Sequence, residues 1–146
     1  MDRLGMAFLI VVWSILVMFP FTIVYADYQV MLYVWKQTLD DPNEILKSWD
    51  STLSNPSTWL YITWNDDTKG VERIDLGNTH LSGPLVPALG KLDKLKYLEL
   101  YGNNINGQIP KELENLANLE SLDLYNNILT GPILGGLGNL TNLRFL

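Results

Sequence analysis

Apolar and polar positions recur with a fixed period of 24 residues between Val71 and Leu146. An isoleucine or a leucine stands at each of four corresponding places: Ile74, Leu98, Leu122 and Leu146. Further apolar columns repeat in the same way, and they comprise Leu76, Leu100 and Leu124; Leu81, Ile105 and Leu129; and Leu89, Leu113 and Leu137. Around residues 95–100 apolar and polar side chains alternate, which predicts a short strand with one buried face. Each unit is expected to return along the opposite side of a coil through the column of Leu89.

Asparagine and glycine columns mark where each coil bends. Asn103 and Asn127 follow the strand segments, at a turn where a side-chain amide can bond unpaired peptide groups of neighbouring coils. Thr79 takes this place in the first unit, so the asparagine ladder is expected to start imperfectly. A second bend is expected at Gly83, Gly107 and Gly131, where no Cβ may intrude. The pattern L-x-x-L-x-L-x-x-N-x-L at this period is typical of leucine-rich repeats.

The residues before the repeats are expected to form a helical cap over residues 27–70. Leu32, Trp35 and Leu39 lie at i, i+3 and i+7, which predicts a helix over residues 27–39 with one apolar face. A second short helix is expected over residues 44–49, with Asn43 as its N-cap. These elements would cover the open apolar end of the first coil. Residues 71–146 then supply three repeats and the start of a fourth, giving an α/β solenoid.

Residues 1–26 have the pattern of a secretory signal peptide. Arg3 precedes an apolar run over residues 6–24, and the Val-x-Ala sequence at residues 24–26 offers small side chains where a signal peptidase reads. Cleavage would leave Asp27 as the first residue. The alternative is a signal anchor, because the run approaches the ~20 apolar residues needed to span a bilayer.

Composition narrows the function classes. The chain has 146 residues, a net charge of −6, one histidine and no cysteine. An acidic chain without a basic cluster argues against nucleic acid as a partner. The scarcity of histidine and cysteine leaves few ligands for zinc or iron, so neither a metal nor a cofactor is expected.

Short strings extend the pattern to a known family. They include Ser48-Trp49-Asp50, the Asn-Pro-x-Thr-Trp motif at residues 55–59, Leu81-Ser82-Gly83 and Leu122-Asp123-Leu124-Tyr125. From about Leu32 to Leu146 the chain resembles the ectodomain of plant somatic embryogenesis receptor kinases and their kinase-less relatives. The resemblance implies a plant-type, right-handed superhelix that pairs with a larger ligand-bound receptor through its cap and concave face.

The same resemblance implies partners and a location. The expected partner is a receptor ectodomain or a receptor-bound peptide or small ligand. The chain is expected in the apoplast or at the outer face of the plasma membrane, with the membrane reached only through an uncleaved N-terminal segment.

Two departures from the family pattern weaken this expectation. The family has a cysteine pair where this chain has Ser57 and Trp64, and a lost disulfide in a secreted cap costs ~2–5 kcal/mol. In the third repeat the family's Ile-Pro becomes Ile133-Leu134, and Gly135-Gly136 is expected to loosen the following turn. The alternative function is therefore a truncated or degenerate receptor remnant without independent activity.

The candidate binding residues project outward from the predicted strands. The columns are Arg73, Tyr97, Ser121 and Phe145; Asp75, Glu99 and Asp123; and Gly77, Tyr101 and Tyr125. Tyrosine offers a large contact area at low entropic cost and one hydrogen-bonding end, which suits protein recognition. The alternative is a merely solvated sheet face. The predicted partner-binding set is Arg73, Asp75, Tyr97, Glu99, Tyr101, Asp123 and Tyr125.

Leu60 and Tyr61 form a second candidate, at the cap edge. They occupy places where the family presents an aromatic residue and a histidine to ligand and partner receptor. The alternative is that both side chains pack around Trp59.

Three further features are candidate sites. Asp75 and Glu99 on adjacent strands approach the ~5–5.5 Å carboxylate spacing of a retaining glycosidase, but no pocket or pKa-raising group accompanies them, so no enzyme and no catalytic residue is expected. His80 has no predicted partner. Asn139-Leu140-Thr141 is a glycosylation sequon, with an unmodified turn residue as its alternative.

The predicted function is co-receptor-like extracellular recognition. The chain would dock to a larger receptor ectodomain or act as a kinase-less modulator of receptors.

Overall fold

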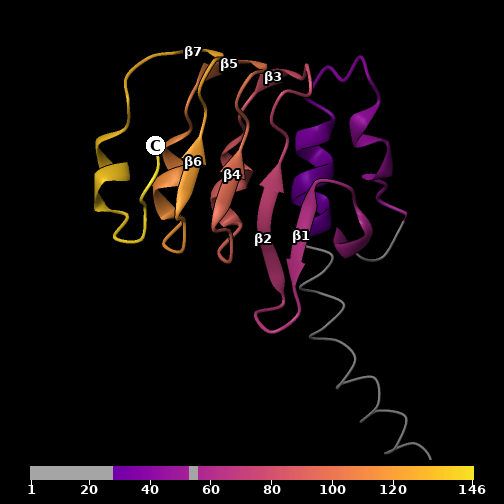
Figure 1. The fold of residues 1–146 in the computed structure, drawn as a ribbon, viewed down its shortest axis with the longest axis horizontal. Helices are drawn as coiled ribbons and strands as arrows, with labels where there is room; N and C mark the ends of the chain where they lie inside the picture. Colours follow the sequence, from indigo (N-terminus) through magenta and orange to yellow (C-terminus); the bar gives the residue numbers. More distant parts are fainter. Residues whose placement is uncertain (1–27, 53–55) are drawn as a thin grey trace, which may run out of the picture.

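The coordinates come from a computed structural model and describe residues 28–52 and 56–146. The predicted signal segment, residues 1–26, lies outside the described residues. Figure 1 shows successive coils stacked side by side, with the strands of each coil aligned along one face of the molecule. No helix in the described ranges is both long and apolar enough to cross a bilayer.

One sheet runs through the successive coils in the order β1-β2-β4-β6. Strands β2 (Gly70–Asp75), β4 (Tyr97–Glu99) and β6 (Ser121–Asp123) are parallel, and β1 (Ile62–Asn65) pairs antiparallel with β2. The register places Ile74 beside Leu98 and Leu98 beside Leu122. All three side chains are fully buried. The predicted strand columns are therefore confirmed, whereas β1 was not predicted.

A second parallel sheet, which the sequence analysis missed, lies along the top of Figure 1. It comprises β3 (Ser82–Pro84), β5 (Asn104–Gln108) and β7 (Ile128–Thr130). These segments contain glycine, proline and asparagine and lack the alternation that marks a half-buried strand. The bends predicted at the glycine column are confirmed, because Gly83, Gly107 and Gly131 all have positive φ, at 126°, 76° and 81°.

Single 3-10 turns form the return side of each coil. They are η3 (Pro87–Lys91), η4 (Lys111–Asn115) and η5 (Gly135–Asn139), and each buries one leucine of the column Leu89, Leu113 and Leu137. The turn at Gly135-Gly136 keeps this form. Its Gly136 N–H donates a 2.9 Å hydrogen bond to Glu114 Oε1 on the preceding coil.

Buried asparagine amides join consecutive coils. The Asn103 Oδ1 accepts hydrogen bonds from the N–H groups of Thr79 and Leu81 at 3.1 and 3.0 Å. Its Nδ2 donates to the carbonyls of Leu76 and Leu100 at 2.7 and 2.9 Å. In the next coil Asn127 repeats the arrangement with Ile105 N and Leu100 O, both at 2.9 Å. The predicted ladder is thus present.

Thr79 begins this ladder in its own way. Its Oγ1 donates to Leu76 O at 2.7 Å within the first coil and contacts Asn103 Oδ1 at 3.0 Å. In the first coil a hydroxyl therefore takes the place of the amide, because no hydrogen bond to an earlier repeat is needed there. A second ladder, not predicted, joins Asn118 Nδ2 to Asp93 O at 2.7 Å and Asn142 Nδ2 to Ala117 O at 2.9 Å.

The N-terminal cap begins with a helix that the structure describes over residues 28–36. Leu32 and Trp35 are fully buried on its inner face, as predicted, whereas Leu39 lies in the turn that follows and is only partly buried. The second predicted helix is a 3-10 turn, η1 (Ile45–Ser48).

The expectation that Asn43 caps the second helix is wrong. Asp41 caps it instead, because its two carboxylate oxygens accept hydrogen bonds from Ile45 N and Leu46 N at 3.0 and 2.8 Å. Glu44 precedes the turn with a left-handed φ of 52°. This backbone reversal turns the N–H groups of η1 toward Asp41 rather than toward Asn43.

Tryptophan side chains fill the cap interior. Trp35 and Trp49 have ring centroids 6.1 Å apart, and Trp49 stacks on Trp59 at 5.6 Å, just after η2 (Pro56–Thr58). Trp35 Nε1 donates to Pro84 O at 3.0 Å, and Trp49 Nε1 donates to Leu60 O at 2.8 Å. The stack is therefore tied to the first repeat through Trp35.

We predict that Asn103→Ala lowers the free energy of unfolding by about 3 kcal/mol, because it strands two N–H groups and two carbonyls in the core. Asn127→Ala is the matched comparison. Asn127 is only half-buried, so its loss is expected to cost about 1–2 kcal/mol. Urea unfolding followed by circular dichroism measures both, and equal losses would contradict the central role given to Asn103.

Candidate functional site

The outward columns of the strands lie in register on one face. Arg73 pairs with Tyr97 and Tyr97 with Ser121, while Asp75 pairs with Glu99 and Glu99 with Asp123. An open hollow of about 330 Å³, here called the concave hollow, is lined by Arg73, Asp75, Tyr97, Glu99, Tyr101, Ser121 and Phe145. The structure therefore brings five of the seven predicted partner-binding residues together. Asp123 and Tyr125 lie beside the hollow and do not line it.

Tyr97 is fixed on this face by two polar contacts. The Arg73 guanidinium carbon lies 3.9 Å from the centre of the Tyr97 ring, within the range of a cation–π interaction. The Tyr97 hydroxyl donates to Glu120 Oε2 at 3.1 Å. Because the ring is already held, a partner that contacts it loses little additional side-chain entropy.

Tyr101 is positioned by the glycine of the preceding coil. An added Cβ on Gly77 would lie only 2.3 Å from Cζ of Tyr101, so the ring lies directly against the glycine. Tyr125, the next member of this column, is 80% exposed. The three predicted tyrosines therefore differ, since Tyr97 and Tyr101 are held against the sheet and Tyr125 projects into solvent.

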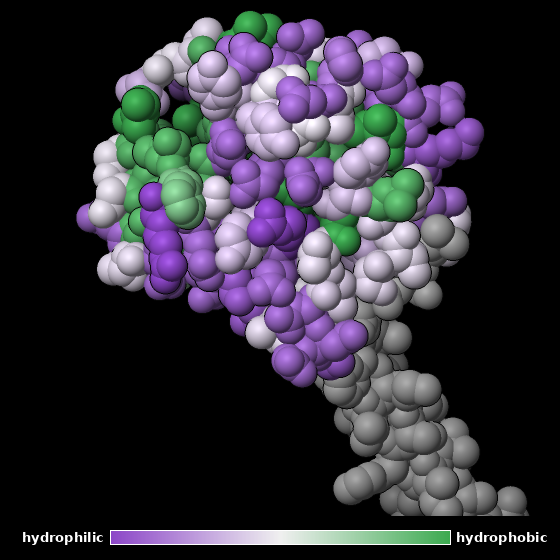
Figure 2. Space-filling view, in the orientation of Figure 1, coloured by the Kyte–Doolittle hydropathy of each residue, from purple (hydrophilic) through white to green (hydrophobic). Residues whose placement is uncertain are grey.

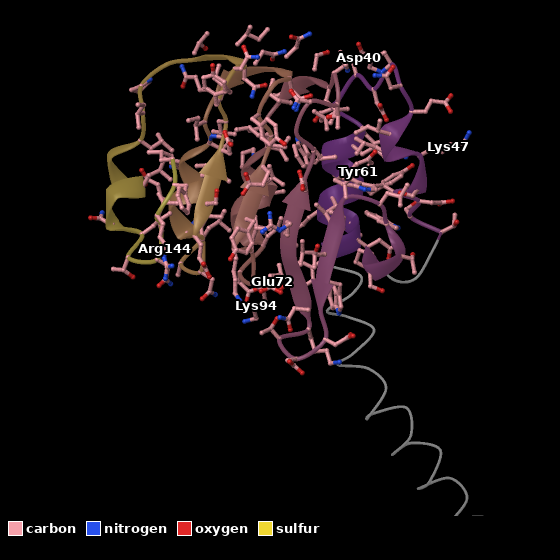
Figure 3. The ribbon with its side chains drawn as sticks, viewed as in Figure 1. Asp40, Lys47, Tyr61, Glu72, Lys94 and Arg144 are labelled. Carbon is pink, nitrogen blue, oxygen red and sulfur yellow. The ribbon has the colours of Figure 1, made fainter. Side chains whose placement is uncertain are left out.

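A row of alternating charges, missed by the sequence analysis, borders the hollow. Its members are Glu72, Lys96, Glu120 and Arg144, each 24 residues apart. Lys96 Nζ lies 2.6 Å from Glu72 Oε1, and Asn65 Nδ2 donates to Glu72 Oε2 at 2.9 Å. Figure 3 labels Glu72 and Arg144 toward the same lower edge of the strands. The sequence signal that could have revealed this row is the alternation of acidic and basic residues at positions 24 apart.

Hydrogen bonds shift the pKa values of the first pair in this row. The hydrogen bond from Lys96, followed by that from Asn65, lowers the pKa of Glu72 from its ordinary 4.5. Glu72 in turn raises the pKa of Lys96 above 10.5. Both groups are therefore held in their charged forms at neutral pH.

Figure 2 shows the same face as a surface. Hydrophilic and intermediate residues cover most of its centre, and hydrophobic residues gather at both sides, toward the last repeat and toward the N-terminal part of the fold. The exposed apolar residues of that repeat are Ile128, Ile133, Phe145 and Leu146. In the described ranges no group of three or more His, Cys, Asp or Glu side chains is arranged to hold a metal ion.

Comparisons with known proteins agree with this architecture. The family model for the Leucine Rich Repeat matches residues 94–116 and 118–140. Leucine-rich repeat protein 1 of Arabidopsis thaliana is 58% identical over 70 residues, which cover 48% of this chain and 32% of that protein. The chain carries leucine-rich repeats and is similar to plant leucine-rich-repeat proteins. It spans about a third of the length of the curated relatives it matches.

Solved plant ectodomains share the fold of this leucine-rich-repeat protein. The crystal structure of the Arabidopsis receptor kinase HAESA with the peptide hormone IDA and the co-receptor SERK1 matches with a TM-score of 0.71 and 38% identity, over 81% of this chain and 20% of that chain. The BIR2 ectodomain from Arabidopsis thaliana matches with a TM-score of 0.56 and 26% identity, over 82% and 77% of the two chains. This fold is generally a non-enzymatic recognition module.

The cap edge presents Leu60 and Tyr61 to solvent. Their side chains are 61% and 42% exposed, so neither is packed into the core around Trp59. Their backbone is firmly held, because Leu60 N donates to Ser48 Oγ at 2.9 Å and Asp75 N donates to Tyr61 O at 2.9 Å. Figure 3 places Tyr61 on the strand side of the cap.

Trp64 stands at one of the two places where the resemblance to the receptor-kinase family implies a cysteine. Its ring is partly buried and meets Tyr28 edge-on, with centroids 5.7 Å apart and planes at 81°. The Tyr28 hydroxyl also donates to Asp93 Oδ1. Burial opposes ionisation of Asp93, but the hydrogen bonds from Lys94 and Tyr28 outweigh it and lower the pKa of that carboxyl. Aromatic packing thus joins the cap to the repeats at this place.

Asn139 and His80 lie on exposed turns. Asn139 is the last residue of η5, on the return side and away from the strand face. Its glycosylation stays a prediction. His80 adopts a left-handed φ of 63° and makes no ion pair within the described residues.

We predict that Glu72→Gln makes the free energy of unfolding fall less between pH 7 and pH 3 than it does in the native chain. Because the pKa of Glu72 is lowered on folding, its contribution is complete above about pH 4.5 and is lost as the pH falls through the lower folded value. At pH 7 the difference from the native chain is expected to be under about 1 kcal/mol. Urea midpoints at pH 7 and pH 3 test this, with Glu112→Gln on η4 as the control. An unchanged acid loss in Glu72→Gln would contradict the expectation.

Proposed function

We propose that this leucine-rich-repeat protein is a co-receptor-like module that docks to a larger receptor ectodomain through its concave strand face. The observation that carries the proposal is the concave hollow, where Tyr97 and Tyr101 are held in place among charged side chains. Tyrosines fixed before contact provide binding area at low entropic cost. In this role the module assists or blocks the pairing of other receptors.

Solved relatives support this type of partner. HAESA is seen with the peptide hormone IDA and the co-receptor SERK1, PEPR1 with AtPEP1, and BIR3 with SERK2. We carry over to this chain only the general expectation of a receptor ectodomain or a receptor-bound ligand as its partner. The exposed cap edge of Leu60 and Tyr61 extends the same face and supplies a second contact.

The location proposed for the module is extracellular, in the apoplast or at the outer face of the plasma membrane. The ectodomain fold and the signal pattern of residues 1–26 support it. Asn139 is exposed and accessible to glycosylation there. A glycan on the return side leaves the strand face free for a partner.

An inactive remnant is the alternative function. Exposed apolar side chains on the last repeat favour it, because Ile133 is 75% exposed and Leu146 is 69% exposed. Such a remnant would self-associate through these residues and bind no receptor. Size-exclusion chromatography separates the alternatives, since a functional module elutes as a monomer.

The direct test is a binding titration of the full chain, secreted from plant cells, against immobilised ectodomains. The probes are HAESA with IDA, PEPR1 with AtPEP1, and BIR3. We expect saturable binding to at least one, and Tyr101→Ala is expected to weaken it by ~10-fold or more. Lys111→Ala, on the return side, is the control and should leave binding unchanged. Absence of binding to every probe by a folded monomer would overturn the proposal.

Gly77→Ala provides a complementary prediction without removing any aromatic ring. The added methyl group displaces Tyr101, because it would otherwise lie 2.3 Å from Cζ, and the half-buried ring lies on the strand face outside the hydrophobic core. We expect several-fold weaker ectodomain binding and a melting temperature within ~2 °C of the native chain. Binding that survives unchanged would show that the position of Tyr101 is unimportant.

A further inference from the structure

The carboxylates of Asp75 and Glu99 lie side by side on β2 and β4 without a counter-ion. The two residues are paired in register, and both line the concave hollow. Neither side chain makes an ion pair or a hydrogen bond with any described residue. Like charges directly opposite each other on adjacent strands are unfavourable. A cation bound between them would relieve this repulsion.

The basic side chains on β2 and just before β4 are already engaged elsewhere. The Arg73 guanidinium lies 3.9 Å from the centre of the Tyr97 ring, and Lys96 forms its ion pair with Glu72 at 2.6 Å. The charged lining of the hollow is therefore one cation against two carboxylates, with Asp123 next in the acidic column. The net charge of the whole chain, −6, has the same sign.

The aromatic lining fits the same ligand chemistry. Tyr101 lies beside the two carboxylates and lines the hollow, while its ring is backed by Gly77. Arg73 on Tyr97 shows, within this chain, how a guanidinium is held over a ring of this face. An extended partner segment lying along the face would let a long side chain enter, because the hollow is open to solvent.

We propose that the concave hollow binds a lysine or arginine side chain from an extended basic segment of the protein partner. The cation lies between the carboxylates of Asp75 and Glu99 and against the ring of Tyr101. This inference rests on the proposed function and specifies the charge of the segment that the concave face recognises. Recognition of this kind weakens as salt increases, because the site is open to solvent.

The test is a titration of the isotope-labelled full chain by nuclear magnetic resonance with three synthetic octapeptides. The peptides differ only at a central residue, which is arginine, its neutral isostere citrulline, or glutamate. We expect the arginine peptide to shift backbone amides of β2 and β4 and to bind at least ~10-fold more tightly than the citrulline peptide. Raising the salt from 0.05 to 0.5 M should remove most of this preference.

Matched variants locate the effect. The double variant Asp75→Asn with Glu99→Gln should retain the native spectrum elsewhere and lose the preference for arginine over citrulline. Glu112→Gln, an acidic residue of η4 on the return side, should keep it. A double variant that still prefers arginine would overturn the assignment of the two carboxylates.

The remaining outcomes separate this inference from the proposed function. Equal binding of the arginine and citrulline peptides at the strand face would overturn the inference and leave face-mediated recognition standing. Tighter binding of the glutamate peptide would overturn it in favour of an acidic partner at Arg73. Failure of all three peptides to bind at millimolar concentration would also overturn it, while the ectodomain titration with Tyr101→Ala decides the proposed function by itself.

Discussion

The buried amide of Asn103 is the contact on which the repeat structure depends. One side chain satisfies two N–H groups of the first coil and carbonyls of the first and second coils, in a place where water cannot reach them. A backbone that bends inside a core needs such a group, because each unpaired peptide group there costs ~1–3 kcal/mol. Asn127 repeats the solution one coil later, with fewer bonds and less burial.

A fixed coil-to-coil bond has consequences for the surface. It keeps every coil in the same register, so residues 24 positions apart lie next to each other on adjacent strands. Chemistry on the strand face is therefore built from columns rather than from a local motif. Arg73 meets Tyr97, and Gly77 meets Tyr101, because each pair belongs to neighbouring units of one column.

Much of this was predictable from periodicity alone. The apolar columns, the asparagine ladder, the glycine bends and the outward strand positions all follow from a 24-residue repeat in which each position has one fixed environment. The second sheet was not predictable in this way, because its strands carry no alternating pattern. The cap contact of Asp41 also escaped prediction, since it depends on the left-handed backbone at Glu44 rather than on residue type. The position of the Tyr101 ring against Gly77 could not be predicted, because residue spacing does not determine the direction of a side chain.

The sign of the charge alternates from coil to coil in the column of Glu72, Lys96, Glu120 and Arg144. Adjacent coils carry opposite charges at this position, so the pattern is restored only after two units, not after one. Loss or duplication of a single 24-residue unit within the array would bring like charges to adjacent strands, whereas a change by two units would preserve the alternation. Otherwise interchangeable coils are thereby distinguished as odd and even, and this side-chain column favours growth or shortening of the solenoid in pairs.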